Sequence, residues 1–430
     1  AGLGVGGVFA LTVAGARSEA NTHQSVRAAI GDNADLLASQ SLSISASADQ
    51  SNRDGDQGQI DSRAQGIAIA VGLSFGVAGG GAGTDNTIAS EGQITVGKNA
   101  RLVAPQLNLA SANRLSKNQW GASQSSTGQT FGGDANTRSV AGSWVGVAIN
   151  PSSTQIGTDS ETFGSSIRID DGALLRATGS TATPGRLNLS SNNDIFATDL
   201  NILDAVSGLG ITYGDSELTN RAKASIDAGK NSRVLNDSGD VMLSSSGNAT
   251  ISSSSSAFSG LFGAGAAFGT AVNKPTQSIT LDGAQIEGNN IQLWSGLSAT
   301  GVPNILRTVA DGRNSVLLLG EALADATAET ADINSITIKA NSDLLARANV
   351  DLRAQEKFGT RGSDARSSAE ANVSLALAIP ITVSPTIKDT TTNTISIDKD
   401  AQITAGLQHD LKLWTLPYGA DLDKQSSYLG

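Results

Sequence analysis

The stretch IDDGALLRA (169–177) recurs in variant form along the chain and decides its fold. Each copy has an apolar residue, then a short polar turn, then a strand of small and apolar residues. The other copies are IGDNADLLA (30–38), VGKNARLVA (96–104), AGKNSRVLN (228–236), LDGAQIEG (281–288), IKANSDLLA (338–346) and IDKDAQITA (397–405). Subtracting successive starting positions gives spacings of 66, 73, 59, 53, 57 and 59 residues. Such a period indicates a stacked array whose units each hold several strands.

Every copy is followed by two apolar residues separated by one other residue. These pairs are Leu42/Ile44, Leu107/Leu109, Leu187/Leu189, Val241/Leu243, Ile291/Leu293, Val350/Leu352 and Leu411/Leu413. Alternation with a period of two is typical of a half-buried strand. We therefore divide the chain into repeats at approximately 1–64, 65–138, 139–204, 205–258, 259–313, 314–371 and 372–430, and expect one continuous segment of a longer protein.

The composition predicts an all-β protein. Gly occurs 49 times and Pro 8 times, whereas aromatic residues make up 4% of the chain. Small and β-branched residues suit thin stacked layers joined by tight turns. We expect an elongated β-solenoid with roughly two to three coils per repeat, giving a rod roughly 70–100 Å long. The best helix candidate is 315–330, although its alignment with strands of the other repeats favours a strand.

Charge and cysteine content exclude several classes of function. The net charge is −11 and the pI is about 4.7, which argues against nucleic-acid binding because phosphate neutralisation needs clustered Lys and Arg. The absence of Cys excludes disulfides and Cys-bound zinc. The apolar residues 1–16 are too short for a transmembrane helix, so we expect a repeat strand there and no transmembrane segment.

Two stretches have the spacing of calcium ligands. Residues 80–85 (GGAGTD) match the start of a calcium-binding nonapeptide ending at Asp85, but that motif needs tandem copies. Residues 50–61 place Asp54 and Asp61 at EF-hand-like offsets without flanking helices. We therefore expect no cofactor, a flexible glycine turn at 80–85 and a solvated loop at 50–61, with weak calcium sites as the alternative.

Residue types used in catalysis do not form a convincing set. Residues 72–76 (GLSFG) fit a nucleophile elbow but lack its strand–turn–helix context. The two histidines, His23 and His409, lie in different terminal repeats, so a catalytic triad is not expected.

Carboxylates in the recurrent turns leave an enzymatic alternative open. The candidates are Asp170, Asp171, Asp282 and Asp398. Turns favour Asp for backbone reasons alone. A polysaccharide-cleaving β-helix enzyme would need three or more carboxylates grouped with Arg or Lys in one groove, whereas scattered turn carboxylates favour a structural protein.

Tryptophans are the candidate contact residues. Trp294 and Trp414 directly follow the second apolar residue of their pairs, so alternation points both outward. Outward aromatic rings can stack on sugars or dock a neighbouring rod; the alternative is packing beneath their own Ser/Gly-rich loops. We expect Trp144 in the core and Trp120 as an anchor or contact in a long loop.

The copies at 169, 281 and 397, together with VGVAIN (145–150), resemble the repeats of very large bacterial surface and secreted proteins of the filamentous-haemagglutinin-like adhesin type. The resemblance covers all seven units. It implies an exported, right-handed β-helical rod at the cell surface or outside the cell, serving adhesion, biofilm matrix or filament assembly. It implies no active-site residue.

We therefore expect a structural or adhesive segment and no enzyme. Its expected partners are other copies of itself, glycans or other cell-surface polymers. The long unpatterned stretches 49–63, 111–138 and 355–370 follow equivalent strands, and we expect them to offer contacts from one face. A carbohydrate-active enzyme and a passive spacer are the alternatives.

Overall fold

The computed structural model describes residues 2–6, 9–50, 64–72, 75–117, 137–180, 182–355, 364–373, 381–406 and 412–414. Every regular element in these ranges is a β-strand, which confirms the all-β prediction. The strands form one sheet of 20 strands and a second sheet of seven short strands. All pairings between named strands are parallel, an arrangement compatible with a β-solenoid.

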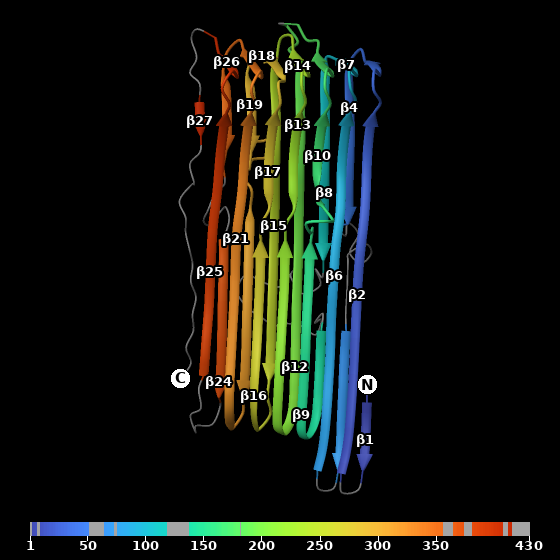
Figure 1. Ribbon diagram of the computed structural model, residues 1–430, viewed down its shortest axis with the longest axis vertical. Helices are drawn as coiled ribbons and strands as arrows, with labels where there is room; N and C mark the ends of the chain where they lie inside the picture. The colour runs from blue at the N-terminus through green and yellow to red at the C-terminus, as the bar shows by residue number, and fades with distance from the viewer. Residues whose placement is uncertain are drawn as a thin grey trace.

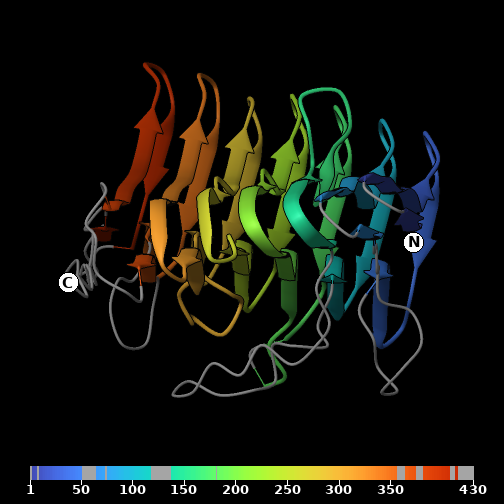
Figure 2. The same cartoon turned by 90° about the horizontal axis from the view of Figure 1, so that it is seen from below.

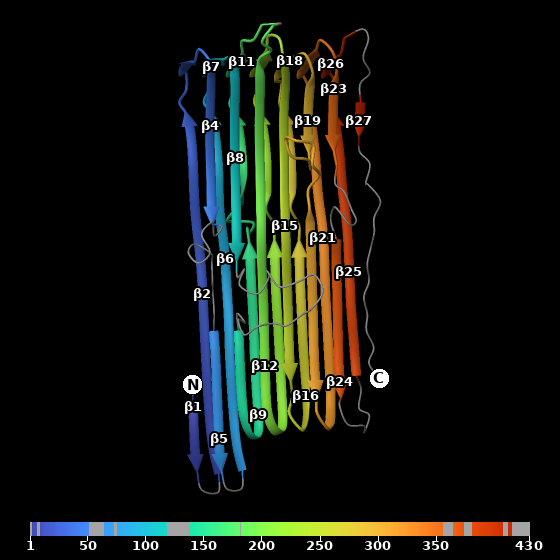
Figure 3. The same ribbon diagram turned by 180° about the vertical axis from the view of Figure 1, so that it is seen from behind.

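Each repeat contributes one narrow loop of chain, which we call a layer (Figures 1 and 2). In each layer a first arm runs toward the end of the molecule that carries the recurrent turns, which we call the turn end. A short strand crosses that end, and a second arm returns to the opposite or far end. The layers lie side by side in chain order from β2 to β25, as the view from behind also shows (Figure 3).

The strands fall into four groups by their place in a layer. The first arms contain β2 (Phe9–Ile30), β6 (Phe75–Val96), β10 (Phe163–Ile169), β13 (Lys223–Ala228), β16 (Phe262–Asn273), β17 (Thr276–Leu281), β21 (Leu319–Ile338) and β25 (Ile381–Ile397). The short crossing strands are β3 (Asp35–Leu37), β7 (Arg101–Ala104), β11 (Leu174–Ala177), β14 (Arg233–Asn236), β18 (Gln285–Gly288), β22 (Asp343–Ala346) and β26 (Gln402–Thr404). The second arms contain β1 (Gly2–Gly6), β4 (Ser41–Gln50), β5 (Ala64–Gly72), β8 (Gln106–Lys117), β15 (Asp240–Phe258), β19 (Ile291–Ser295), β20 (Leu306–Val316), β23 (Val350–Ala354), β24 (Asp364–Val373) and β27 (Lys412–Trp414). β9 (Thr137–Ile156) and β12 (Arg186–Asn220) run around the far end and belong to both arms.

Successive copies of the recurrent stretch are hydrogen-bonded neighbours. Their first residues pair in order, Ile30 with Val96, Val96 with Ile169, Ile169 with Ala228, Ala228 with Leu281, Leu281 with Ile338, and Ile338 with Ile397. Each repeat therefore adds one layer, and the expected two to three coils per repeat are wrong. Seven layers at about 4.8 Å span only roughly 30 Å, whereas a 22-residue strand such as β2 extends roughly 70 Å. The long dimension of the described chain follows the strands, not the stack.

The recurrent turn is explained by one backbone conformation. A residue of each copy has positive φ: Asn33 (58°), Asn99 (54°), Gly172 (71°), Asn231 (56°), Gly283 (66°), Asn341 (61°) and Asp400 (67°). Gly, Asn and Asp tolerate this left-handed region best. The backbone N–H of Asn231 donates to the carbonyl of Gly283 in the next layer at 2.8 Å, so the turns also stack.

We expect Asn231→Ala to lower the free energy of unfolding by about 1–2 kcal/mol, because alanine meets the steric penalty of the left-handed region. Asn231→Gly keeps the conformation accessible and is the matched control. Chemical denaturation of the two variants measures the difference. A glycine variant as unstable as the alanine variant would show that the Asn side chain, and not φ, holds the turn.

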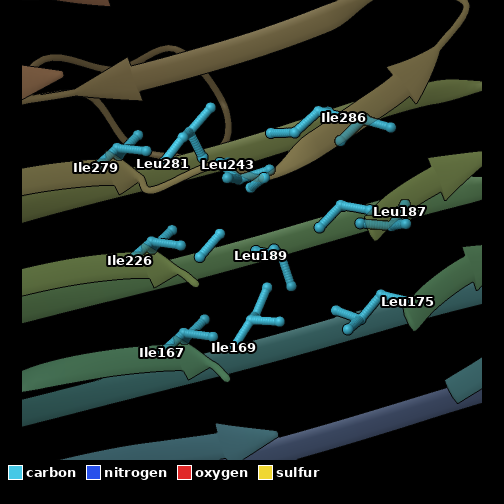
Figure 4. Close-up of a cluster of buried hydrophobic side chains, with 14 of the residues drawn as sticks. Ile167, Ile169, Leu175, Leu187, Leu189, Ile226, Leu243, Ile279, Leu281 and Ile286 are labelled. Atoms are coloured by element: carbon cyan, nitrogen blue, oxygen red, sulfur yellow. The ribbon is translucent and has the colours of Figure 1, made fainter. Parts of the chain in front are cut away.

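Aliphatic side chains fill the half of each layer next to the turn end, the turn half. Here the arms carry Ile, Leu and Val inward, and the apolar pairs identified in the sequence stack across the layers (Figure 4). Leu189, for example, pairs with Leu109 on one side and Leu243 on the other, and all three are 0% exposed. Parallel sheets buried in this way are stabilised mainly by such apolar contacts.

Small and polar side chains fill the other half, the far half. Its inward positions are rich in Ala, Gly, Ser and Asn. Asn150 is fully buried; its Oδ1 accepts from the Ala82 N–H at 2.9 Å, and its Nδ2 donates to the Ile202 carbonyl at 3.0 Å. A Cβ on Gly312 would lie 2.3 Å from the Asp325 carbonyl oxygen of the opposite arm. The two arms are therefore too close in the far half for large inward side chains on both arms at one position; the buried Leu203, for example, lies against Gly214.

Residues 315–330 are strand, not helix. β20 ends at Val316 and β21 begins at Leu319, so the far-end turn of that layer falls between them. The predicted insertions interrupt the second arms at similar heights: Gln50 pairs with Leu115, Ala64 with Thr137, and Arg307 with Asp364. The predicted equivalence of the three stretches is thus supported by the register of the strands that flank them. Residues 51–63, 118–136 and 356–363 lie outside the described residues.

Candidate interaction surface

The outward side chains of the first arms differ between the two halves of the molecule. In the turn half the outward positions are polar, as in the row Arg168, Asp227 and Thr280. In the far half large apolar residues face outward while small ones face inward. Val13 is 75% exposed and its neighbour Ala14 is buried. The polarity of the sheet is therefore inverted in the far half.

These outward apolar residues form three rows across the layers, which we call the outer apolar surface. The rows are Leu11, Val77, Val145, Leu209, Phe262 and Leu319; Val13, Gly79, Val147, Ile211 and Ala264, which Glu321 follows in the next layer; and Ile149, Tyr213, Ala266 and Leu323. Ile149 is 48% exposed and Ile211 is 45% exposed. Contiguous exposed apolar residues on a protein surface mark interaction sites more often than isolated ones do.

Carboxylates border the outer apolar surface on the side toward the turn end. We call this border the acidic row; it consists of Glu19, Asp85, Asp215, Glu217 and Asp325. Glu19 pairs with Asp85 in the next layer, and Asp215 and Glu217 lie two residues apart on β12. Arg17 lies among them, with its guanidinium 3.6 Å from the Asp85 carboxylate. One cation among five carboxylates leaves this border negative.

A groove of about 640 Å³ lies where the outer apolar surface meets the acidic row. Gly15, Gly81 and Gly83 provide its apolar floor, and Ile149 and Pro151 also line it. Its charged lining is Arg17, Asp85, Asp215 and Glu217. Burial raises the pKa of the Asp215 carboxyl, and the neighbouring Glu217 carboxylate raises that pKa further.

Trp294 is not the exposed contact that alternation predicted. Trp294 is on the outward side of β19 but is only 8% exposed. A Cβ on Gly301 would lie 3.4 Å from its ring, and the Arg353 guanidinium lies 5.2 Å from the ring centroid. Trp294 therefore packs beneath its own 296–305 loop, the alternative interpretation. Trp120 and the side chain of Trp414 lie outside the described residues.

Trp144 is the exposed tryptophan among the described residues. The expectation that it lies in the core is wrong, because it is 60% exposed at the far end. Its apolar strand context suggested burial, but in the far half the outward positions are the apolar ones. Val206, 61% exposed, continues this apolar character on the second arm.

The two stretches with the spacing of calcium ligands do not form a calcium site within the described residues. Residues 80–85 lie inside the continuous strand β6, so the expected flexible glycine turn is wrong. Asp85 pairs with Arg17, while Asp54 and Asp61 lie outside the described residues. Within the described part of the chain, no group of three or more His, Asp or Glu side chains could hold a metal ion.

The other sequence candidates are not brought together. His23 is exposed on β2. His409 and Ser74, the serine of the GLSFG stretch, both lie outside the described residues. The turn carboxylates serve neighbouring turns: Asp171 Oδ1 accepts from the Lys230 N–H at 2.9 Å, and Asp282 pairs with Lys339 at 3.3 Å. These contacts are consistent with the backbone role expected of Asp in turns.

Sequence reasoning missed the outer apolar surface and the acidic row. A signal was present in VGVAIN (145–150), where large apolar residues alternate with Gly, Ala and Asn. This pattern shows that the strand has one face of large apolar residues and one face of small residues. The face with the larger apolar residues is usually the buried one. The close approach of the two arms reverses that assignment.

Comparison with protein-family models, curated proteins and solved structures found no match to this chain. In the described ranges no helix has the length and apolar character needed to cross a membrane.

Proposed function

We propose that this chain is a structural and adhesive segment of an exported bacterial surface or matrix protein, built as a right-handed seven-layer β-solenoid. Right-handed winding is supported by the strong preference of parallel β crossovers for that hand. The in-register stacking of all seven repeats carries the proposal, because it makes a stiff scaffold whose outer side chains repeat in rows. Adhesion would use the outer apolar surface.

Self-assembly is the second part of this proposal and would use the sheet edges. Among the described residues, β2 pairs only with β6, and β25 pairs only with β21. Unpaired strand edges are templates for pairing with another chain. Copies of residues 1–430 would stack through these edges into filaments.

Electron microscopy and sedimentation of purified residues 1–430 over a range of concentrations test the assembly. We expect filaments that lengthen with concentration. A proline at outward position 25 of β2 (Ser25→Pro) removes an N–H donor from the open edge and should shorten the filaments, whereas Ser25→Thr is the matched control. Discrete monomers at every concentration, together with no retention on cell-surface polymers, would contradict the proposed function.

A second candidate function, polysaccharide cleavage, is favoured by one observation. The groove combines Asp85, Asp215 and Glu217 with Arg17, and the raised pKa of Asp215 is what a general acid needs. Incubation with acidic and neutral polysaccharides, followed by reducing-end assays, tests this. Cleavage that is lost in Asp215→Asn would favour the enzyme, and the absence of cleavage would favour the structural proposal.

A further inference from the structure

The outer apolar surface is large enough for a segment of polypeptide. Three rows and six layers place its Cα positions over roughly 13 Å by 24 Å. All-parallel sheets in proteins usually have both faces covered, most often by helices. Here Val13, Ile149 and Ile211 are between 45% and 75% exposed, so this part of the sheet has no cover within the described chain.

The negative charge of the acidic row limits which partners could cover the outer apolar surface. The acidic row disfavours a second copy of the chain at this surface, because that copy would bring the same negative border. The same charges disfavour an anionic lipid surface. Open sheet edges are also not tolerated in hydrocarbon. A partner with apolar side chains and a row of Lys or Arg matches both the apolar rows and the carboxylates.

We propose that the outer apolar surface and the acidic row together bind a cationic amphipathic polypeptide. One of its apolar side chains lies over Gly81 and Gly83 in the groove, where no Cβ atoms of the protein intervene. Its Lys or Arg side chains pair with Asp85, Asp215 and Glu217. This proposal rests on the proposed adhesive function and assigns the chemistry of its partner.

The groove supplies the anchoring position for such a segment. A side chain in a concave apolar site loses contact with water and contributes more than a contact on a flat face. The carboxylates next to it set the orientation and the salt dependence of binding, because exposed charges are screened within about 8 Å at physiological ionic strength. Apolar and charged contacts are therefore separable by mutation.

Fluorescence anisotropy with a labelled peptide of about 14 residues, with leucine on one helical face and lysine on the other, tests the proposal. We expect saturable binding that weakens about tenfold in the double variant Asp215→Asn/Glu217→Gln and in Ile211→Ser. Asp227→Asn, a carboxylate of the same layer in the turn half, is the matched control and should bind normally. Circular dichroism and thermal melting of each variant establish that it is folded.

Two further probes distinguish the alternatives. The same peptide with glutamate in place of lysine should not bind, and 0.5 M NaCl should weaken binding of the lysine peptide. Equal binding of both peptides, or an unchanged affinity of the double variant, would overturn the proposal. Dimers or zwitterionic vesicle binding that Ile211→Ser abolishes would instead assign the surface to a second copy or to lipid. Filament formation through the sheet edges is measured separately, so the two proposals can fail independently.

Discussion

Gly269→Ala should lower the free energy of unfolding by about 1–3 kcal/mol, the range for overpacking a dense interior. Gly269 faces inward on β16, and a Cβ there would lie 2.3 Å from the backbone carbonyl oxygen of Asp311 on the opposite arm. A backbone atom cannot rotate away as a flexible side chain can, so the two arms must separate locally. The midpoint of denaturant unfolding measures the loss.

Gly15→Ala provides the matched control for this prediction. Gly15 is also a strand glycine, in β2, but no atom lies within 4 Å of a Cβ built there. Its alanine variant should stay within about 0.5 kcal/mol of the parent protein. Equal losses in both variants would mean that intrinsic strand preference, and not the spacing of the arms, dominates the response.

The register of the layers was predictable because the recurrent turn needs a rare backbone conformation. Only a few residue types tolerate positive φ, so Asn99, Gly172 and Asn231 stand out at matching positions. The apolar pairs after each turn are likewise visible, since the turn half follows the usual rule of apolar inside and polar outside. Both signals are local and need no knowledge of the opposite arm.

The number of layers and the outer apolar surface could not be predicted in the same way. The far-end bend of β12 has no strong turn signal, and its 35 residues form one uninterrupted strand assignment. Alternation around Tyr213 separates two faces of that strand but does not say which face is buried. That choice depends on the distance between the arms, which the glycines of a different strand help to set.

Trp294 also shows that alternation predicts the side of a strand but not the exposure of a side chain. Alternation correctly places it on the opposite side of β19 from Leu293. Its exposure is decided by the 296–305 loop, and no periodic pattern describes how a loop folds back over a strand. Trp144 is exposed for the complementary reason, because an apolar neighbourhood indicates burial only where the inside of the protein is apolar.

Leu189→Ala should cost about 2–5 kcal/mol, the range for removing a large aliphatic side chain from a packed core. Leu189 is fully buried in the turn half (Figure 4), and its register partners in the neighbouring layers are Leu109 and Leu243. A cavity there removes contacts with two neighbouring layers at once. In a stacked array whose stability comes largely from nearest-neighbour contacts, the loss should therefore appear in the unfolding of adjacent repeats as well.

Ile211→Ala, on the same strand, separates core packing from the outer surface. It removes a comparable aliphatic group, but from a side chain that is 45% exposed and faces outward. Its cost should be below about 1 kcal/mol, because little apolar area is withdrawn from contact. Denaturant unfolding of the two variants under identical conditions makes the comparison. If Ile211→Ala were as damaging as Leu189→Ala, the outer apolar surface would already be packed against part of the chain and would not be available to a partner.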